Sequence, residues 1–439
     1  MSRGKSKTLL AIIGAVLAVL IALTFATFPV GEVSEYTSAL GAIELDYDLE
    51  GGKAYTLKLS EENEEEVTDI NQVLDTLEYR LTALGYSAYS VKAIKSTDPA
   101  VLDHDIRIEV KETETVDSDI EVVAAFGEVA FYGGTSANPT EQILEGKKVV
   151  DSASYLGAVT SGNTTAYQMT IKFTDDAYAY IIDAINAAEA DGGSYYLEVK
   201  LGDQVLLSGS SAITAGSFYN RLLYITSQNE AGAKQMALQV TSGGLAYQYE
   251  IDSVEDISSP YGEGVATKCA IAIGVLFLVL MVAIIVIYKG FGWISALSTL
   301  AFMLLEIWML IAVPGIVLSL GGVVGIAVAL LLAVYSMIIT AERIKEEYSH
   351  SEKTVKAAIN RGFQQSLVPV ISVNVVVGII AIALLAFTSG TVKCFAITLG
   401  IGAVISLMAA LLFTRMFTSL IMPLVKNKEK FLNMKKVEA

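Results

Sequence analysis

The sequence has 439 residues, of which 53% are apolar, and its mean hydropathy is positive. This composition excludes a single soluble globule, and the length allows more than one domain. Charge is uneven, because residues 29–267 contain 40 acidic and 13 basic side chains whereas the remainder contains 7 and 17. An acidic water-facing domain joined to a basic membrane part is the simplest interpretation. The acidic domain would repel phosphates, which argues against nucleic acid as a partner.

The cysteines and histidines do not form a metal-binding pattern. Cys269 and Cys394 lack CxxC spacing, and His104 and His350 are far apart. We therefore expect no metal site and no cofactor. Both cysteines fall near the outer ends of expected helices, so a bridge between them stays open, although two separate packing residues are preferred.

The first apolar segment, residues 8–28, is long enough to cross a membrane, which takes about 20 residues. Basic residues precede it, so residues 1–28 are predicted to be a cytoplasmic N-terminus and an uncleaved transmembrane anchor. A five-helix membrane domain is expected over residues 268–425. Its predicted helices are 269–288, 293–312, 315–341, 367–388 and 395–425, which makes six crossings in all.

Basic residues gather in residues 342–365 and in the tail, residues 426–439. Since basic loops stay in the cytoplasm, we expect both termini inside and residues 29–267 outside a bacterial plasma membrane. Residues 351–366 are predicted to form an amphipathic helix on the inner surface of the lipid bilayer. Glu342 and Arg343 would mark the cytoplasmic end of the fourth span.

Residues 29–140 are predicted to form an extracytoplasmic α+β base subdomain. Its expected elements are a strand at 53–60, an amphipathic helix over 61–85, strands at 87–95 and 105–111, a helix at 118–126 and a strand at 128–134. This β-α-β-β-α-β order is typical of a ferredoxin-like unit.

A second α+β unit, the head subdomain, is expected over residues 141–240, and residues 241–267 would return to the base. Its predicted elements are a strand at 166–173, a helix from Asp175, a hairpin over 195–209 and a helix over 230–244. We find no residues with catalytic spacing, so the sequence does not indicate an enzyme.

Several motifs resemble the SecD family of the resistance–nodulation–division superfamily. After the first span, "DYDLEGG" resembles the family's Asp-Leu-x-Gly-Gly turn, here Asp48, Leu49, Gly51 and Gly52. In the membrane half, "LGGVVGIAVALLLAVYSMIITAERIKEEY", "AAINRGFQQSLVPVISVN" and "FTSGTVKCFAITLGIGAVISL" are similar to the family in order and spacing. Glycines at 321, 322, 325, 400 and 402 are expected to allow close helix packing.

The resemblance implies a SecF-like partner subunit, contact with the SecYEG channel, and unfolded polypeptide as the substrate. It also implies a late translocation step driven by the proton gradient. The base and head would handle the translocating chain outside the membrane.

This sequence departs from the family at the positions of the intramembrane proton relay. Tyr335 and Met337 stand where the family has Asp and Asn, and Ser372 replaces an Asp in the fifth helix, while Asn374 is retained. Tyrosine has a pKa near 10 and is a poor proton carrier. We hypothesise a hydrogen bond between Tyr335 and Asn374, with Ser336 or Ser372 nearby.

Glu306, in the third span, is an intramembrane acid, and such residues are costly and usually functional. Three interpretations stay open: a relocated proton carrier, a partner for a polar group on SecF or another helix, or a side chain that extends to the outer interface or faces a water-filled crevice without transport work.

Three functions stay open as well. The first is a SecD-type export subunit, whose proton conduction could have degenerated with the loss of the acid at Tyr335. The second is one half of a superfamily exporter for lipids or small molecules. The third is a membrane scaffold or assembly factor that transports nothing.

Overall fold

The computed structural model describes residues 3–432, except 31–33, 61–69, 95–104, 128, 137–138, 145–147, 162–163, 203, 210–211, 228, 243–244, 246, 314–315, 350–353 and 389. The chain divides into two compact units. The membrane unit comprises residues 1–51 and 258–439, and the β-rich unit comprises residues 52–257. Each unit is described by itself.

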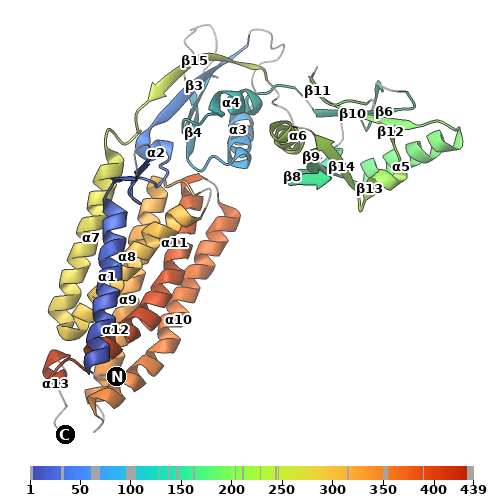
Figure 1. Cartoon of the computed structure of the whole chain (residues 1–439). Coiled ribbons are helices and arrows are strands. Elements are labelled where there is room, and N and C mark those ends of the chain that lie inside the picture. The colour runs from blue at the N-terminus through green and yellow to red at the C-terminus, as the bar shows by residue number, and fades with distance from the viewer. Residues whose placement is uncertain are drawn as a thin grey trace. The chain divides into compact units, whose positions relative to one another are not determined.

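Among its described residues, the membrane unit contains six helical segments that are long and apolar enough to cross a membrane (Figure 1). They are α1 (Arg3–Phe25), α7 (Val265–Tyr288), α8 (Gly290–Ala312), α9 (Leu320–Ser349), α10 (Val355–Phe387), and α11 (Gly390–Met408) continued by a π-helical turn, Ala409–Phe413, and α12 (Thr414–Ile421). The short elements are the β1–β2 hairpin (Phe28–Val30, Ser34–Tyr36), α2 (Tyr47–Glu50) and α13 (Lys428–Phe431). Each of the six predicted spans is confirmed.

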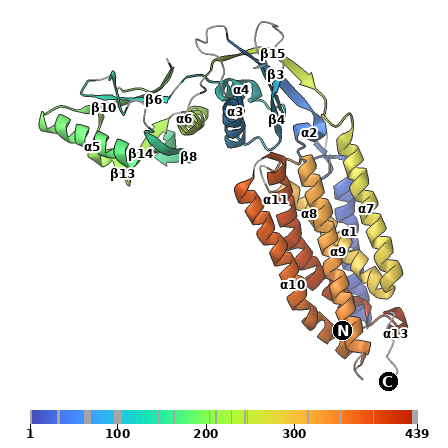
Figure 2. The same ribbon diagram turned by 180° about the vertical axis from the view of Figure 1, so that it is seen from behind.

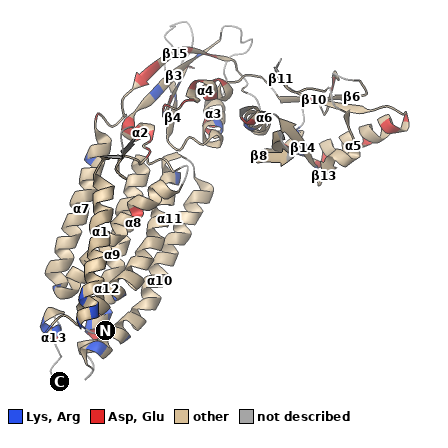
Figure 3. Ribbon diagram, in the orientation of Figure 1, with Lys and Arg blue, Asp and Glu red and all other residues tan. Residues whose placement is uncertain are grey.

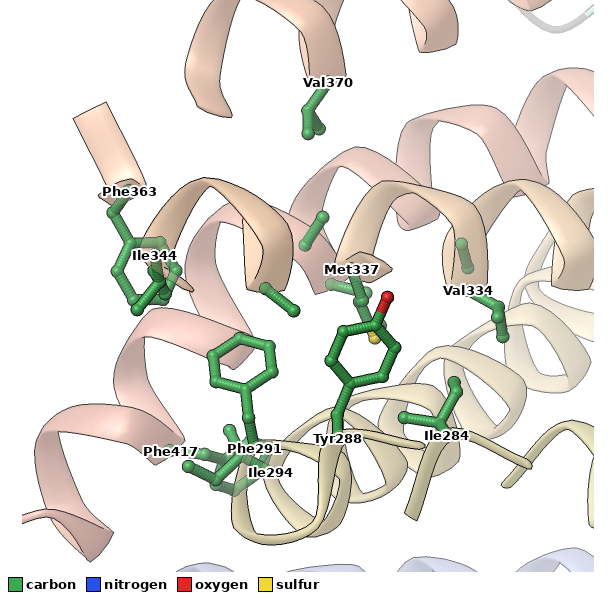
Figure 4. Packing of buried hydrophobic residues seen from close by; sticks show 14 of the residues in the cluster. Ile284, Tyr288, Phe291, Ile294, Val334, Met337, Ile344, Phe363, Val370 and Phe417 are labelled. Atoms are coloured by element: carbon green, nitrogen blue, oxygen red, sulfur yellow. The ribbon is translucent and has the colours of Figure 1, made fainter. Parts of the chain in front are cut away.

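Helices α8, α9 and α11 form the buried centre of the membrane unit, whereas few residues of α1 and α7 are buried. The core includes Tyr288, Phe291 and Met337, which lie close together in Figure 4. Helices α9 and α11 approach closely because glycines face each contact. A Cβ on Gly325 would lie 2.0 Å from Thr398 Oγ1, and one on Gly402 would lie 2.2 Å from the Ala329 Cβ. The packing role predicted for Gly400 is wrong, since its nearest contact would be an ordinary 3.5 Å.

Two expectations about the basic loops are corrected. Helix α9 continues to Ser349, so Glu342 and Arg343 lie within it and form short-range surface ion pairs, not a helix end. The predicted surface helix over 351–366 is wrong, because its described part is the beginning of the long helix α10. Val355, Ala358 and Phe363 are buried in the core of the membrane unit, and this packing holds the first turns of α10 in line with the rest (Figure 2).

The described ends of the chain meet at one end of the helix bundle. Arg3 donates a hydrogen bond from Nε to the Pro423 carbonyl oxygen at 3.0 Å. Figure 3 shows lysine and arginine residues, in blue, gathered at this end. The clustering agrees with the charge pattern used for the topology prediction, although the side of the membrane that it faces stays a prediction.

The first sheet of the β-rich unit has the strand order β15-β3-β5-β4, with all neighbours antiparallel. Its elements are β3 (Gly52–Leu59), α3 (Ile70–Leu84), β4 (Tyr89–Ile94), β5 (Asp105–Val110), α4 (Val116–Val123) and β15 (Tyr249–Ile257). The β-α-β-β-α-β order matches the prediction, but the closing strand differs. Residues 128–134 were expected to close the sheet, whereas the returning strand β15 does so.

Two further sheets make up the rest of the β-rich unit, with orders β11-β10-β6-β7 and β13-β14-β9-β8; β12 also pairs with β10. Their elements are β6 (Val129–Gly134), β7 (Glu141–Gln142), β8 (Val150–Ser161), β9 (Thr164–Phe173), α5 (Asp175–Ala190), β10 (Tyr195–Leu201), β11 (Gln204–Leu207), β12 (Ala212–Ile213), a 3-10 turn (Ala215–Ser217), β13 (Phe218–Tyr219), β14 (Leu222–Ser227) and α6 (Glu230–Ser242). Strand β6, which was expected in the base subdomain, pairs instead with β10 of the predicted head.

Arg80 of α3 connects the two parts of the β-rich unit. The fully buried guanidinium donates from Nη1 to the carbonyl oxygens of Val123 (2.7 Å) and Ala125 (3.0 Å), and from Nε to Ser242 Oγ (3.0 Å). Burial lowers the pKa of Arg80 to about 10. The Arg80 side chain thereby bonds both the end of α4, after which the chain leaves the first sheet, and the end of α6, which precedes the returning strand β15.

Candidate functional site

The Asp-Leu-x-Gly-Gly motif caps a membrane helix. Asp48 is buried, and its Oδ2 accepts a hydrogen bond from the backbone N–H of Leu320 at 2.8 Å, at the first residue of α9. Its carbonyl oxygen accepts a hydrogen bond from Ser259 Oγ at 2.6 Å. An acid at a helix N-terminus satisfies an unpaired donor and complements the helix dipole. The motif therefore attaches two segments, the one that follows α1 and the one that precedes α7, to the beginning of α9.

The other motif residues have separate local roles. Leu49 is buried against Leu310 and Leu318 in a small apolar cluster. Gly51 has a φ of +103°, which favours glycine. Within the β-rich unit, a Cβ on Gly52 would lie 2.0 Å from the carbonyl oxygen of Val110, so only glycine allows β3 this close to β5.

Burial raises the pKa of Asp48 to about 6, outweighing the opposing effect of the bond from Leu320. The folded protein therefore favours the protonated acid more than the unfolded chain does. We expect the stability supplied by Asp48 to be complete below pH 4 and to be lost as pH rises through about 6. Asp48→Asn should remove this dependence.

The measurement is thermal unfolding of the wild type and of Asp48→Asn in detergent across this pH range. The stability of the wild type relative to the variant should fall as pH rises from 4 to 6. A difference that stays constant with pH would contradict the expectation.

The structure does not bring the four relay-matching positions together. Tyr335 is 52% exposed and Ser372 is exposed, whereas Met337 and Asn374 are buried. The hydrogen bond predicted between Tyr335 and Asn374 is wrong. Asn374 Nδ2 donates to Ser336 Oγ at 3.0 Å and to the Val370 carbonyl oxygen at 2.8 Å. Tyr335 and Ser336 are neighbours on α9, and a step of one residue turns the side chain away by about 100°.

Glu306 lies inside the helix bundle. Its side chain is fully buried, and neither carboxylate oxygen has a hydrogen-bond partner among the described residues. A Cβ on Gly402 of α11 would lie 3.1 Å from Oε1 and 3.3 Å from Oε2. The interpretation in which Glu306 extends to the outer interface is therefore wrong. A buried charge without a partner costs several kcal/mol, so an acid at this place is unusual.

Several buried hydroxyl groups of the bundle core already have partners. Ser298, Thr299, Thr340 and Thr398 each donate to a backbone carbonyl oxygen. In the described part of the bundle core, polar atoms without a hydrogen bond include the Glu306 carboxylate, Asn374 Oδ1 and Ser406 Oγ. Ser406 was not predicted from the sequence, although its position one helical turn after Gly402 indicates the same face of α11.

The two cysteines are free thiols, so the open alternative of a bridge is not realised. Cys394 instead donates a hydrogen bond to the Val317 carbonyl oxygen at 3.2 Å, next to the start of α9. Within the described residues, no group of histidine, cysteine and acidic side chains is arranged to hold a metal. His104 and His350 lie outside those residues.

Residues 239–422 match the family model for the protein export membrane protein SecD/SecF, C-terminal domain. The protein translocase subunit SecD of Escherichia coli (strain K12) is 29% identical over 242 residues, which are 54% of this chain and 38% of that protein. The SecD of Acidaminococcus fermentans is 26% identical over 423 residues, 94% of this chain and 91% of that protein. The chain thus spans well under half of the enterobacterial relative and nearly all of the second.

A crystal structure of SecDF in a super-membrane-facing form shares the fold, with a TM-score of 0.71 and 20% sequence identity. The similarity covers 94% of this chain and 57% of the SecDF chain. The fold, the match over the membrane half and the relatives agree with one another. Residues 239–422 thus resemble the C-terminal domain of the SecD/SecF protein export membrane proteins, and nearly the whole chain is similar to a SecD subunit.

Proposed function

We propose that this chain is a SecD-type subunit of the protein export machinery, which assists the late movement of unfolded polypeptide across the bacterial plasma membrane. The observation that carries the proposal is the shared fold with SecDF over 94% of the chain, together with the SecD relative that aligns along nearly its whole length. In this role the β-rich unit lies outside the cell and handles the polypeptide, while both termini lie in the cytoplasm.

The same comparison supports a SecF-like partner. The SecDF chain is longer, and this chain covers 57% of it. A second subunit with its own membrane helices would supply the remainder, and the pair would act beside the SecYEG channel. The exposed surfaces of α10, where Val368, Val376 and Ile382 project outward, offer an apolar helix face inside the membrane for such a partner.

We propose Glu306 as the proton-binding residue of this subunit. The positions that match the family's relay hold no acid, and Glu306 is a buried intramembrane carboxylic acid without a hydrogen-bond partner in the described structure. Such a group can bind and release a proton when a neighbouring helix moves, because its two forms differ strongly in how well the closed bundle accepts them. If Glu306 does not serve in this way, the proton-driven step belongs to the partner.

The export role is tested by purifying the tagged chain from its native membrane in mild detergent and identifying bound proteins by mass spectrometry. We expect SecF-like and SecYEG subunits to be recovered. Recovery of neither, under conditions that keep a control translocon assembled, would contradict the proposal and favour a lipid or small-molecule exporter or a membrane scaffold.

A further inference from the structure

Strand β8 is the terminal strand of the sheet β13-β14-β9-β8. It is among the longest strands of the β-rich unit, Val150–Ser161, and in the described structure it pairs only with β9. The register shifts between Tyr155 and Gly157, where Gly157 has a φ of +119°. A terminal strand presents backbone N–H and C=O groups that can pair with another chain.

Thr241 of α6 shows which backbone groups of β8 face this edge. Its Oγ1 accepts a hydrogen bond from the Ala153 N–H at 2.8 Å and donates one to the Ala153 carbonyl oxygen at 2.9 Å. These are the two bonds that a residue of a neighbouring antiparallel strand would make. One side chain therefore takes the place of a strand at the beginning of this edge.

The outward direction repeats at every second residue of a strand. Counting from Ala153, Tyr155 also faces the edge. Beyond the irregularity, Ala158 pairs with Tyr167 and Thr160 pairs with Thr165. On β9, Tyr167 and Thr165 lie an even number of residues from Ile171, which is the partner of Ala153. The backbone groups of their own partners, Ala158 and Thr160, therefore point to the free edge as those of Ala153 do.

The same edge borders a cleft and carries exposed apolar side chains. A cavity of about 400 Å³ lies along Ala153 and Tyr155, and its other walls include Tyr79 of α3 and Lys234 and Thr241 of α6. Farther along β8, Leu156 is 55% exposed and Val159 is also exposed. Open backbone groups can pair with the main chain of an extended peptide, and the apolar surface beside them can contact its side chains.

We propose that the edge of β8 from Tyr155 to Thr160, continued by the cleft at Ala153, binds a segment of unfolded polypeptide as an added β-strand. The proposal rests on the proposed export function and assigns a site to its substrate. Backbone pairing does not depend on the side chains of the bound peptide, which suits a protein that handles many different chains. A lipid acyl chain cannot satisfy the outward-facing N–H and C=O groups.

The test uses the full-length chain in detergent, with a photo-crosslinking amino acid in place of Leu156. The matched control places the same group at Tyr219, which is 72% exposed on β13, at the opposite edge of the same sheet. The probe is a fluorescent unstructured peptide rich in serine, threonine and valine. We expect peptide cross-links at position 156 and not at 219. Equal labelling at the two positions, or cross-links only between two copies of the chain, would overturn the proposal.

Peptide affinity is then measured by fluorescence anisotropy. Ala158→Pro removes one outward N–H and should weaken binding about fivefold, whereas Ala158→Val keeps the N–H and should not. A peptide with proline at every second residue should fail to bind. Unchanged affinity for Ala158→Pro, or equal binding of the proline peptide, would overturn the proposal.

Two further measurements keep the result interpretable. Thermal unfolding shows whether Ala158→Pro remains folded, and Thr160→Pro serves as the edge variant if it does not. Co-purification of SecF-like and SecYEG subunits reports the export role separately. Partners without peptide binding would overturn the site alone, whereas loss of the partners from the wild type would count against the function.

Discussion

Replacing Glu306 by glutamine is expected to reduce proton-gradient-driven export by about tenfold or more while the subunit stays folded and assembled. Glutamine has nearly the same size and fits the same buried place between α8 and α11, but it cannot bind and release a proton. The measurement is secretion of a reporter protein by cells that depend on this chain, with and without an uncoupler. Partner recovery from the same membranes reports assembly.

Glu306→Asp should retain part of the activity, because it keeps the acid at a shorter reach. Glu342→Gln is the matched control, since Glu342 is an exposed acid within α9 and should have little effect. Full export by Glu306→Gln would show that this chain carries no proton at Glu306. The proton-driven step would then belong to the partner subunit.

Gly402→Ala is expected to destabilise the membrane unit by about 2–3 kcal/mol, because overpacking a tight contact forces helices apart. The new Cβ would lie 2.2 Å from the Ala329 Cβ and 3.1 Å from Glu306 Oε1. Neither α9 nor α11 can move without disturbing the packing around Thr398. Thermal unfolding in detergent, followed by intrinsic fluorescence, measures the change.

Two variants separate this clash from a general cost of changing a glycine in α11. Gly400→Ala should be nearly neutral, because its Cβ would lie 3.5 Å from the nearest side chain. Ala329→Gly should restore part of the stability lost by Gly402→Ala, since it removes the atom in the closest contact. Equal destabilisation by both glycine variants, without rescue, would contradict the assignment.

The sequence alone determined the six membrane spans and most elements of the β-rich unit. A span depends on about 20 apolar residues in succession, and an amphipathic helix depends on the spacing of neighbours, so both are local properties. Helices α7 and α8 end at the predicted residues 288 and 312. The return of residues 241–267 to the base was also expected, and β15 makes this return by pairing with β3.

Strand partners and side-chain directions were decided by the tertiary structure. The pattern in residues 128–134 predicts a strand correctly but does not say that β10 would pair with it, since partner choice depends on residues far apart in the sequence. The sequence analysis missed β8, whose serines and glycine weaken the alternation that marks a strand. Its polar composition suits an edge, where only one side of the backbone is paired.

The polar groups of the membrane unit show the same division. The sequence identified Glu306 and Asn374 as unusual, because polar groups in an apolar segment are recognised by composition alone. Only the packing of α9, α10 and α11 decided that Asn374 bonds Ser336 and that Glu306 faces Gly402. A rotation of about 100° per residue separates Ser336 from Tyr335, and the helix that fills the opposing space selects which of them is buried.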